Sequence, residues 1–154
     1  MCFYRILMPL FFVLSGIISI SGVVNAEEII FKCTRTEHNY TEDYELKVVS
    51  ADARRGIRGK IFVDGRDLSQ TSNDDVRQEI KSVSISNDKV IFLIDTYFSP
   101  EQFEGNSYGA GSVIALTTIS RSSGLLKRVE TIHGGFLGSS MGEGTKIYTE
   151  KCSL

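Results

Sequence analysis

Short runs of β-branched and aromatic residues recur from residue 28 to the end of the chain, and they constrain the fold more than any other feature. Several runs alternate apolar and polar residues with the period of two that turns one side of a strand towards a core. We expect about eight strands, over 28–34, 44–49, 60–63, 80–86, 89–98, 112–119, 125–132 and 145–151. The run 89–98 is apolar at successive positions in its centre, which predicts a central strand covered on both faces.

The segments between these runs carry turn signals. Asp-Gly at 64–65, Asn-Asp at 87–88 and Ser-Ser-Gly at 122–124 are typical of tight connections between strands. Helix signals are few: 99–102 resembles a capping box with proline at the first helical position, and 73–78 predicts one more short turn. We therefore predict an all-β fold, a single antiparallel meander forming a small barrel, with a two-sheet sandwich as the alternative.

The first 26 residues have the organisation of a secretory signal peptide. Arg5 gives a charged start, 6–24 is uncharged, and Val-Asn-Ala at 24–26 places small residues where signal peptidase reads them. We expect cleavage after Ala26, leaving a single β domain over 27–154 that is periplasmic or secreted and not stably inserted in a membrane. The alternative is an uncleaved anchor, because the apolar run approaches the ~20 residues that span a bilayer.

Two cysteines remain in that domain, Cys33 near its start and Cys152 near its end. An isolated pair in an oxidising compartment usually forms a disulfide. Neither cysteine belongs to a Cys-x-x-Cys motif or has a histidine within four residues, so the sequence gives no support for a redox or metal role. The predicted disulfide ties the first strand to the last, which favours a closed or nearly closed barrel.

The charge of the domain is nearly balanced. Residues 27–154 keep 16 of the 17 basic residues and all 19 acidic residues, a net charge of −3. This gives no general reason to expect nucleic acid or an anionic membrane as partner. One local excess makes four side chains at 54–60 a candidate binding surface: Arg54, Arg55, Arg58 and Lys60. The alternative is a solvated turn whose charges protect a sheet edge from aggregation.

Two patterns resemble catalytic or metal motifs but lack the partners that the chemistry needs. Gly138–Gly142 matches G-x-S-x-G, yet no histidine lies among the 14 residues after Ser140. We expect a flexible glycine-rich loop over 133–145 instead. His38 and His133 are isolated, so we expect no metal, cofactor or catalytic residue.

Two further features stay open. Asn39-Tyr40-Thr41 is a formal glycosylation acceptor, which matters only in a eukaryotic source. Asp95 and Glu130 are the acids that the strand pattern places nearest a core. A small hydrolase using this carboxylate pair is the alternative function, and it requires the two groups within ~10 Å of each other.

The leader, Phe31-x-Cys33, the partner cysteine near the end and the run from Ser140 to Tyr148 resemble the small periplasmic C-type lysozyme inhibitors. Members of that family are antiparallel β-barrels held by terminal disulfides, with a Ser/Gly-rich inhibitory loop. The resemblance implies a binding surface at Ser140, Lys146 and Tyr148. Here the run ends four residues before Cys152, whereas the family has further strands after its loop, so the chain is not identified as a member.

These observations predict a non-catalytic exported domain that binds an extracytoplasmic protein or a small ligand. Binding residues usually gather on loops carried by a rigid scaffold. The two surfaces expected to serve are therefore the basic cluster at 54–60 and the glycine-rich loop at 133–145.

Overall fold

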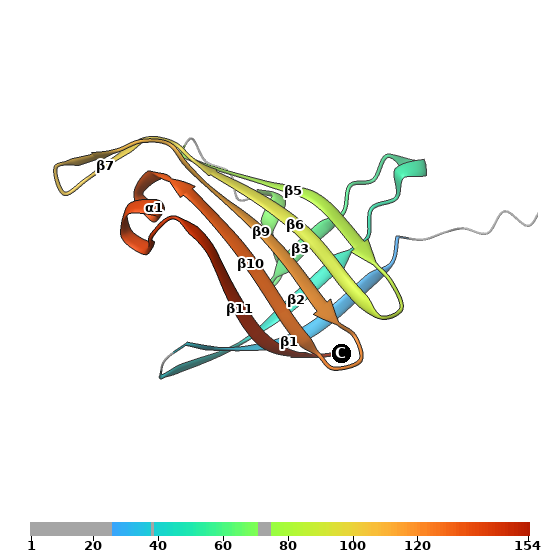
Figure 1. Ribbon diagram of the computed structural model, residues 1–154. Helices are drawn as coiled ribbons and strands as arrows, with labels where there is room; N and C mark the ends of the chain where they lie inside the picture. The colour runs from blue at the N-terminus through green and yellow to red at the C-terminus, as the bar shows by residue number, and fades with distance from the viewer. Residues whose placement is uncertain (1–25, 38, 71–74) are drawn as a thin grey trace, which may run out of the picture.

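The structure is a computed structural model that describes residues 26–37, 39–70 and 75–154 (Figure 1). Within these residues, nine strands form one curled antiparallel sheet and two form a separate small hairpin, which confirms the all-β fold class. The sheet order is β4-β3-β2-β1-β11-β10-β9-β6-β5. Its strands are β1 (Glu28–Glu37), β2 (Tyr40–Val49), β3 (Lys60–Val63), β4 (Arg66–Asp67), β5 (Val76–Ile85), β6 (Lys89–Phe98), β9 (Gly111–Ser120), β10 (Leu125–Gly134) and β11 (Gly144–Ser153). The predicted leader cleavage falls at the boundary of the described residues, and 1–25 lie outside them.

Two meanders make up the curled sheet. One runs from β1 to β4 and the other from β5 through β6, β9 and β10 to β11, and the pairing of β1 with β11 joins them. Cys33 lies directly opposite Cys152 at this seam, with the Cα atoms 4.0 Å apart and the sulfurs bonded at 2.08 Å. The predicted disulfide is confirmed, and it links the first strand to the last.

The two edges of the sheet approach each other but share no hydrogen-bonded ladder among the described residues. The 3₁₀ turn η2 (Leu68–Gln70) contacts both β3 and β5, and the Gly59 backbone lies against the side chain of Val83. The result is a curled sheet in the shape of a half-barrel (Figure 1). The sheet therefore curls as expected, but among the described residues it stays a half-barrel because β4 and β5 do not pair.

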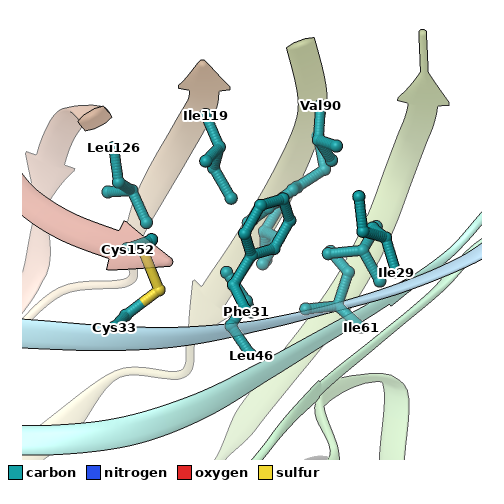
Figure 2. Close-up of a cluster of buried hydrophobic side chains, with 12 residues drawn as sticks. Ile29, Phe31, Cys33, Leu46, Ile61, Val90, Ile119, Leu126 and Cys152 are labelled. Atoms are coloured by element: carbon teal, nitrogen blue, oxygen red, sulfur yellow. A yellow bond between two sulfur atoms is a disulfide. The ribbon is translucent and has the colours of Figure 1, made fainter. Parts of the chain in front are cut away.

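Alternate residues of the strands form the core inside the curl. Phe31 lies at its centre, close to the Cys33–Cys152 disulfide (Figure 2). Burying each large apolar side chain stabilises the fold by about 1.5–3 kcal/mol relative to exposure. The buried cluster comprises Ile29, Phe31, Cys33, Leu46, Val48, Ile61, Val90, Phe92, Ile94, Ile119, Leu126 and Cys152.

The prediction that 89–98 is covered on both faces is wrong. Its bounds are those of β6, but β6 lies next to the edge strand β5. Phe92 and Ile94 point inward and are buried, whereas Ile91 and Leu93 point outward and are only partly buried. The outward side chains are covered only by neighbours on the same face, because the described chain supplies no second layer over β6.

The two predicted helical turns are also wrong. Residues 99–102 enter a hairpin of β7 (Glu101–Phe103) and β8 (Asn106–Tyr108), whose turn at Glu104 and Gly105 has positive φ at both residues. This is the geometry that matches strand twist in two-residue hairpins. Of 73–78, the residues from 76 onward belong to β5, and 73–74 lie outside the described residues.

A short helix occurs where a flexible loop was expected. This helix, α1 (Gly135–Met141), packs Phe136 against Phe103 and Tyr108 of the β7–β8 hairpin, with ring centroids 5.2 Å apart in both pairs. Lys146 donates a hydrogen bond to the Met141 carbonyl at the end of α1. The aromatic contacts are tertiary, which is why local sequence did not predict the helix.

Candidate functional site

The interior of the half-barrel is packed in one half and hollow in the other. The hollow half, towards the strand ends that lead into β7 and α1, contains a cavity of about 280 Å³. Its apolar wall comes mainly from β3, β6 and β9, and includes Val63, Phe92, Ile94, Val113 and Ala115. Its polar wall comes mainly from β1, β2 and β10, and includes Arg35, Glu42, Tyr44, Arg128 and Glu130.

Strand alternation explains why charged residues reach this interior. Side chains two positions apart on a strand share one face. Arg35 follows the buried Cys33, and Arg128 and Glu130 follow the buried Leu126. The same faces that pack the core at one end therefore deliver charged groups to the cavity at the other.

Glu150 of β11 anchors a buried polar network beside the cavity. The residue is only 5 % exposed. Its Oε1 accepts a hydrogen bond from Arg35 Nε at 3.2 Å, its Oε2 accepts one from the Tyr44 hydroxyl, and Arg128 Nη2 lies 3.9 Å from Oε1. A buried carboxylate is costly unless it is paired and hydrogen-bonded, and this one has three partners.

The network shifts the ionisation of its members. Burial raises the pKa of Tyr44, and the hydrogen bond to Glu150 and the negative charge of that carboxylate raise it further. Burial opposes the charge of Arg35, but the attraction and hydrogen bond of Glu150 more than offset it and raise the pKa of Arg35. Both effects keep the two groups protonated across the physiological range.

Arg128 lies at the centre of the polar wall and is incompletely paired. Its guanidinium sits over the Tyr148 ring, 5.0 Å from the centroid. Its Nε lies 3.0 Å from Glu130 Oε1, an ion-pair distance, but the N–H is not directed at that oxygen. Among described side chains that are not exposed, Nε is the one buried nitrogen or oxygen without a hydrogen-bond partner.

The predicted basic cluster lies away from this site. Arg55 pairs with Asp52 at 3.4 Å and Lys60 with Asp67 at 3.5 Å, while Arg54 and Arg58 are exposed. The segment projects from the sheet on the side opposite α1 (Figure 1). Two of its four basic side chains, Arg55 and Lys60, are therefore already paired with carboxylates of the same chain.

Of the three candidate residues from the glycine-rich run, the structure brings only one to the cavity network. Ser140 donates a hydrogen bond to the Leu137 carbonyl at 3.5 Å within α1, and Lys146 donates to the Met141 carbonyl. Tyr148 alone among them joins the cavity network, through the face of its ring beneath Arg128. His133 is exposed on β10, and His38 lies outside the described residues.

The structure does not bring the two hydrolase candidates together. Glu130 lines the cavity. Asp95 stands in register with the exposed Ile114 on the outer face, 4.0 Å from Lys81. The sheet separates the two carboxylates, which removes the pair on which the hydrolase alternative relied.

An apolar row on the outer face of the sheet was not predicted. Leu93, Leu116, Val129 and Ile147 stand opposite one another across β6, β9, β10 and β11. Leu116 and Ile147 are well exposed. Exposed apolar surface can mark an interface, but the outer row offers no polar group to orient a ligand.

No protein-family model, curated protein or solved structure matches the chain. Over 26–37, 39–70 and 75–154, no group of three histidine, cysteine, aspartate or glutamate side chains is placed to hold a metal ion. The same residues include no helix with the length and apolar character needed to cross a bilayer.

Proposed function

We propose that this domain is an exported binding protein that holds a small amphiphilic ligand inside the half-barrel. The observation that carries the proposal is the hollow half of the interior, where an apolar wall faces a polar one across a cavity of about 280 Å³. Ligand sites are typically concave, mostly apolar and equipped with a few fixed polar groups. At ~30 Å³ for each water-sized group, the cavity has room for roughly ten non-hydrogen atoms.

The rigidity of the surroundings supports this proposal. The disulfide and the packed core hold the strands at one end, so the polar groups at the other end are positioned before any ligand arrives. Pre-positioned groups lower the entropy lost on binding. Disulfides persist in oxidising compartments, which agrees with export of the domain.

The proposal is tested with protein expressed with residues 1–26 and recovered after export. Its intact mass should equal that of the chain from Glu27 onward less two hydrogens, as expected for a cleaved leader and a formed disulfide. A mass that still includes residues 1–26 would contradict export. The probe is methyl anthranilate, a fluorescent amphiphile small enough for the cavity, and its fluorescence should change saturably with one site per chain. Replacing Ala115, which lines the cavity, with tryptophan should abolish the signal because the new ring fills the space.

The matched control is Ile114→Trp, which adds the same ring to the neighbouring residue on the outer face. It should leave the fluorescence unchanged. Val113→Phe is a second cavity-filling variant in case Ala115→Trp does not fold, and thermal unfolding monitors folding of all three. Loss of the signal in Ile114→Trp and not in the two folded cavity variants would place the site on the outer row and refute the proposal.

A further inference from the structure

The buried part of the polar wall contains more hydrogen-bond donors than acceptor oxygens. Two further carboxylates that line the cavity, Glu42 and Asp64, are exposed to solvent. Each guanidinium of Arg35 and Arg128 carries five N–H donors and no acceptor. The carboxylate that faces both, Glu150, already accepts from Arg35 and from the Tyr44 hydroxyl. The second carboxylate, Glu130, is close to Arg128 but poorly aligned with its Nε–H.

Arg128 is the clearest sign of this imbalance. Its Nε is buried without a hydrogen-bond partner. Leaving a buried donor unpaired costs about 1–3 kcal/mol, more when the group is charged, so its neighbours leave the guanidinium with donor capacity to spare. Stacking on Tyr148 fixes the plane of the guanidinium and thus the direction of its donors.

The opposite wall suits an apolar group. Phe92, Ile94, Val113 and Ala115 face the arginines from β6 and β9. A ligand that spans the cavity therefore meets donors at one side and hydrocarbon at the other. A cationic head group would bring more donors to a wall that already has a surplus.

From this juxtaposition we infer that the ligand is a short amphiphile whose head group is an acceptor, a carboxylate or an amide carbonyl, held by Arg128, with its apolar part against β6 and β9. This inference rests on the proposed function, because it names the class of molecule that occupies the same cavity. It also assigns Arg128 as the residue that reads the head group, with Arg35 and Tyr44 fixing the network behind it.

Three probes with one tail and different heads test the inference: octanoate, octanamide and octylammonium. Isothermal titration calorimetry should show octanoate and octanamide binding about tenfold tighter than octylammonium, a difference worth about 1.4 kcal/mol. Arg128→Met keeps an unbranched apolar stem but removes the guanidinium and all of its donors. It should weaken the first two probes about tenfold and leave octylammonium unchanged or tighter.

Arg77→Met is the matched control, because Arg77 stacks on Tyr97 at 5.7 Å much as Arg128 stacks on Tyr148, but on the outer face. It should change none of the affinities. Glu130→Gln acts in the opposite direction: it removes a competing carboxylate beside Arg128 and should tighten octanoate several-fold. A variant that merely loosened the fold would not produce this gain.

The outcomes separate the two levels of the argument. If neither methyl anthranilate nor any octyl probe binds, the proposed function is wrong. If the probes bind and Ala115→Trp blocks them, but octylammonium binds as well as octanoate or Arg128→Met has no effect, the ligand class is wrong and the binding function stands. Tighter octanoate binding in Glu130→Gln, together with weaker octanoate binding in Arg128→Met, supports both the binding function and the ligand class.

Discussion

Glu150 shows how a single buried charge organises the interior. It is 5 % exposed, yet it lies two residues from the buried Cys152 on the same face of β11. Arg35 has the same relation to Cys33 across the seam. The disulfide thus aligns the two strands so that an arginine and a glutamate meet at 3.2 Å immediately above it.

Removing the hydroxyl of Tyr44 should change both the stability of the domain and its dependence on pH. Tyr44→Phe takes one donor from the buried Glu150, which should lower the free energy of unfolding at pH 7 by about 1–2 kcal/mol. Because the folded state raises the pKa of Tyr44, its contribution is fully present below the ordinary tyrosine pKa of about 10 and is lost as pH rises through the higher folded value.

Urea unfolding at several pH values measures this effect. The stability difference between wild type and Tyr44→Phe should be constant below pH ~10 and shrink above it. Tyr97→Phe on the outer face is the control, since Tyr97 is 41 % exposed and its ring stacks with Arg77. A difference that grows with pH would contradict the assignment of the Tyr44 proton to the Glu150 contact.

At the scale of elements, period-two patterns predicted the strands of the main sheet well. The bounds of β3 and β6 match the prediction. β5 begins four residues before its predicted segment and ends one residue before the segment does, and the other long strands extend their predicted segments by a few residues. Where the prediction failed, a distant contact decides the structure. Phe136 holds α1 against the β7–β8 hairpin, and neither element has a strong local signal of its own.

The candidate site was only partly predictable for a related reason. Glu130 was expected near a core, but Arg35, Tyr44 and Arg128 were not singled out, because charged residues in strands usually face solvent. Strand parity counted from Cys33 and Leu126 would have placed Arg35 and Arg128 on the inner face. That parity predicts which face of the sheet a side chain occupies. It does not predict whether a cavity lies there, because the volume left empty depends on how tightly the sheet curls.

The contact between the two edges of the sheet makes Gly59 sensitive to substitution. A Cβ at this position would lie 2.6 Å from the Val83 Cβ and Cγ2 atoms. Gly59→Ala should therefore force β3 and β5 apart and lower the free energy of unfolding by about 1–3 kcal/mol. Adding Val83→Ala should recover part of that loss, because it removes Cγ2, one of the two clashing atoms, and leaves only Cβ.

Chemical denaturation of the two single variants and the double variant measures the coupling. Gly109→Ala is the matched control, since a Cβ there meets nothing within 4 Å. If the double variant is less stable than the sum of the single changes predicts, Gly59 and Val83 do not pack as the structure shows.

For the whole molecule, the seam between β1 and β11 joins the two meanders through a short stretch of pairing. Its register pairs only Lys32, Cys33 and Thr34 with Ser153, Cys152 and Lys151, whereas β1 pairs with β2 along all of its length. The disulfide sits in the middle of these three pairs. It therefore holds together two meanders that share few backbone hydrogen bonds.

Removing the disulfide should destabilise the domain strongly and open it at that seam. The bond joins residues 119 apart in sequence, and on the chain-entropy model a loop of this size contributes about 4–5 kcal/mol, a large part of the 5–15 kcal/mol typical of a folded domain. Cys33→Ala/Cys152→Ala should lose that amount in urea unfolding. Reduced wild type is the control, because it keeps both sulfur atoms and lacks only the bond.

Amide hydrogen exchange then tests where the molecule opens. Protection should fall first in β1 and β11 and last in β6 and β9, which pair with each other along ten residue pairs. Arg35 and Arg128 lie on opposite sides of the seam, so both proteins without the disulfide should also bind octanoate more weakly. A uniform loss of protection over the sheet, or a loss of stability below about 1 kcal/mol, would show that the core and not the disulfide holds the two meanders together.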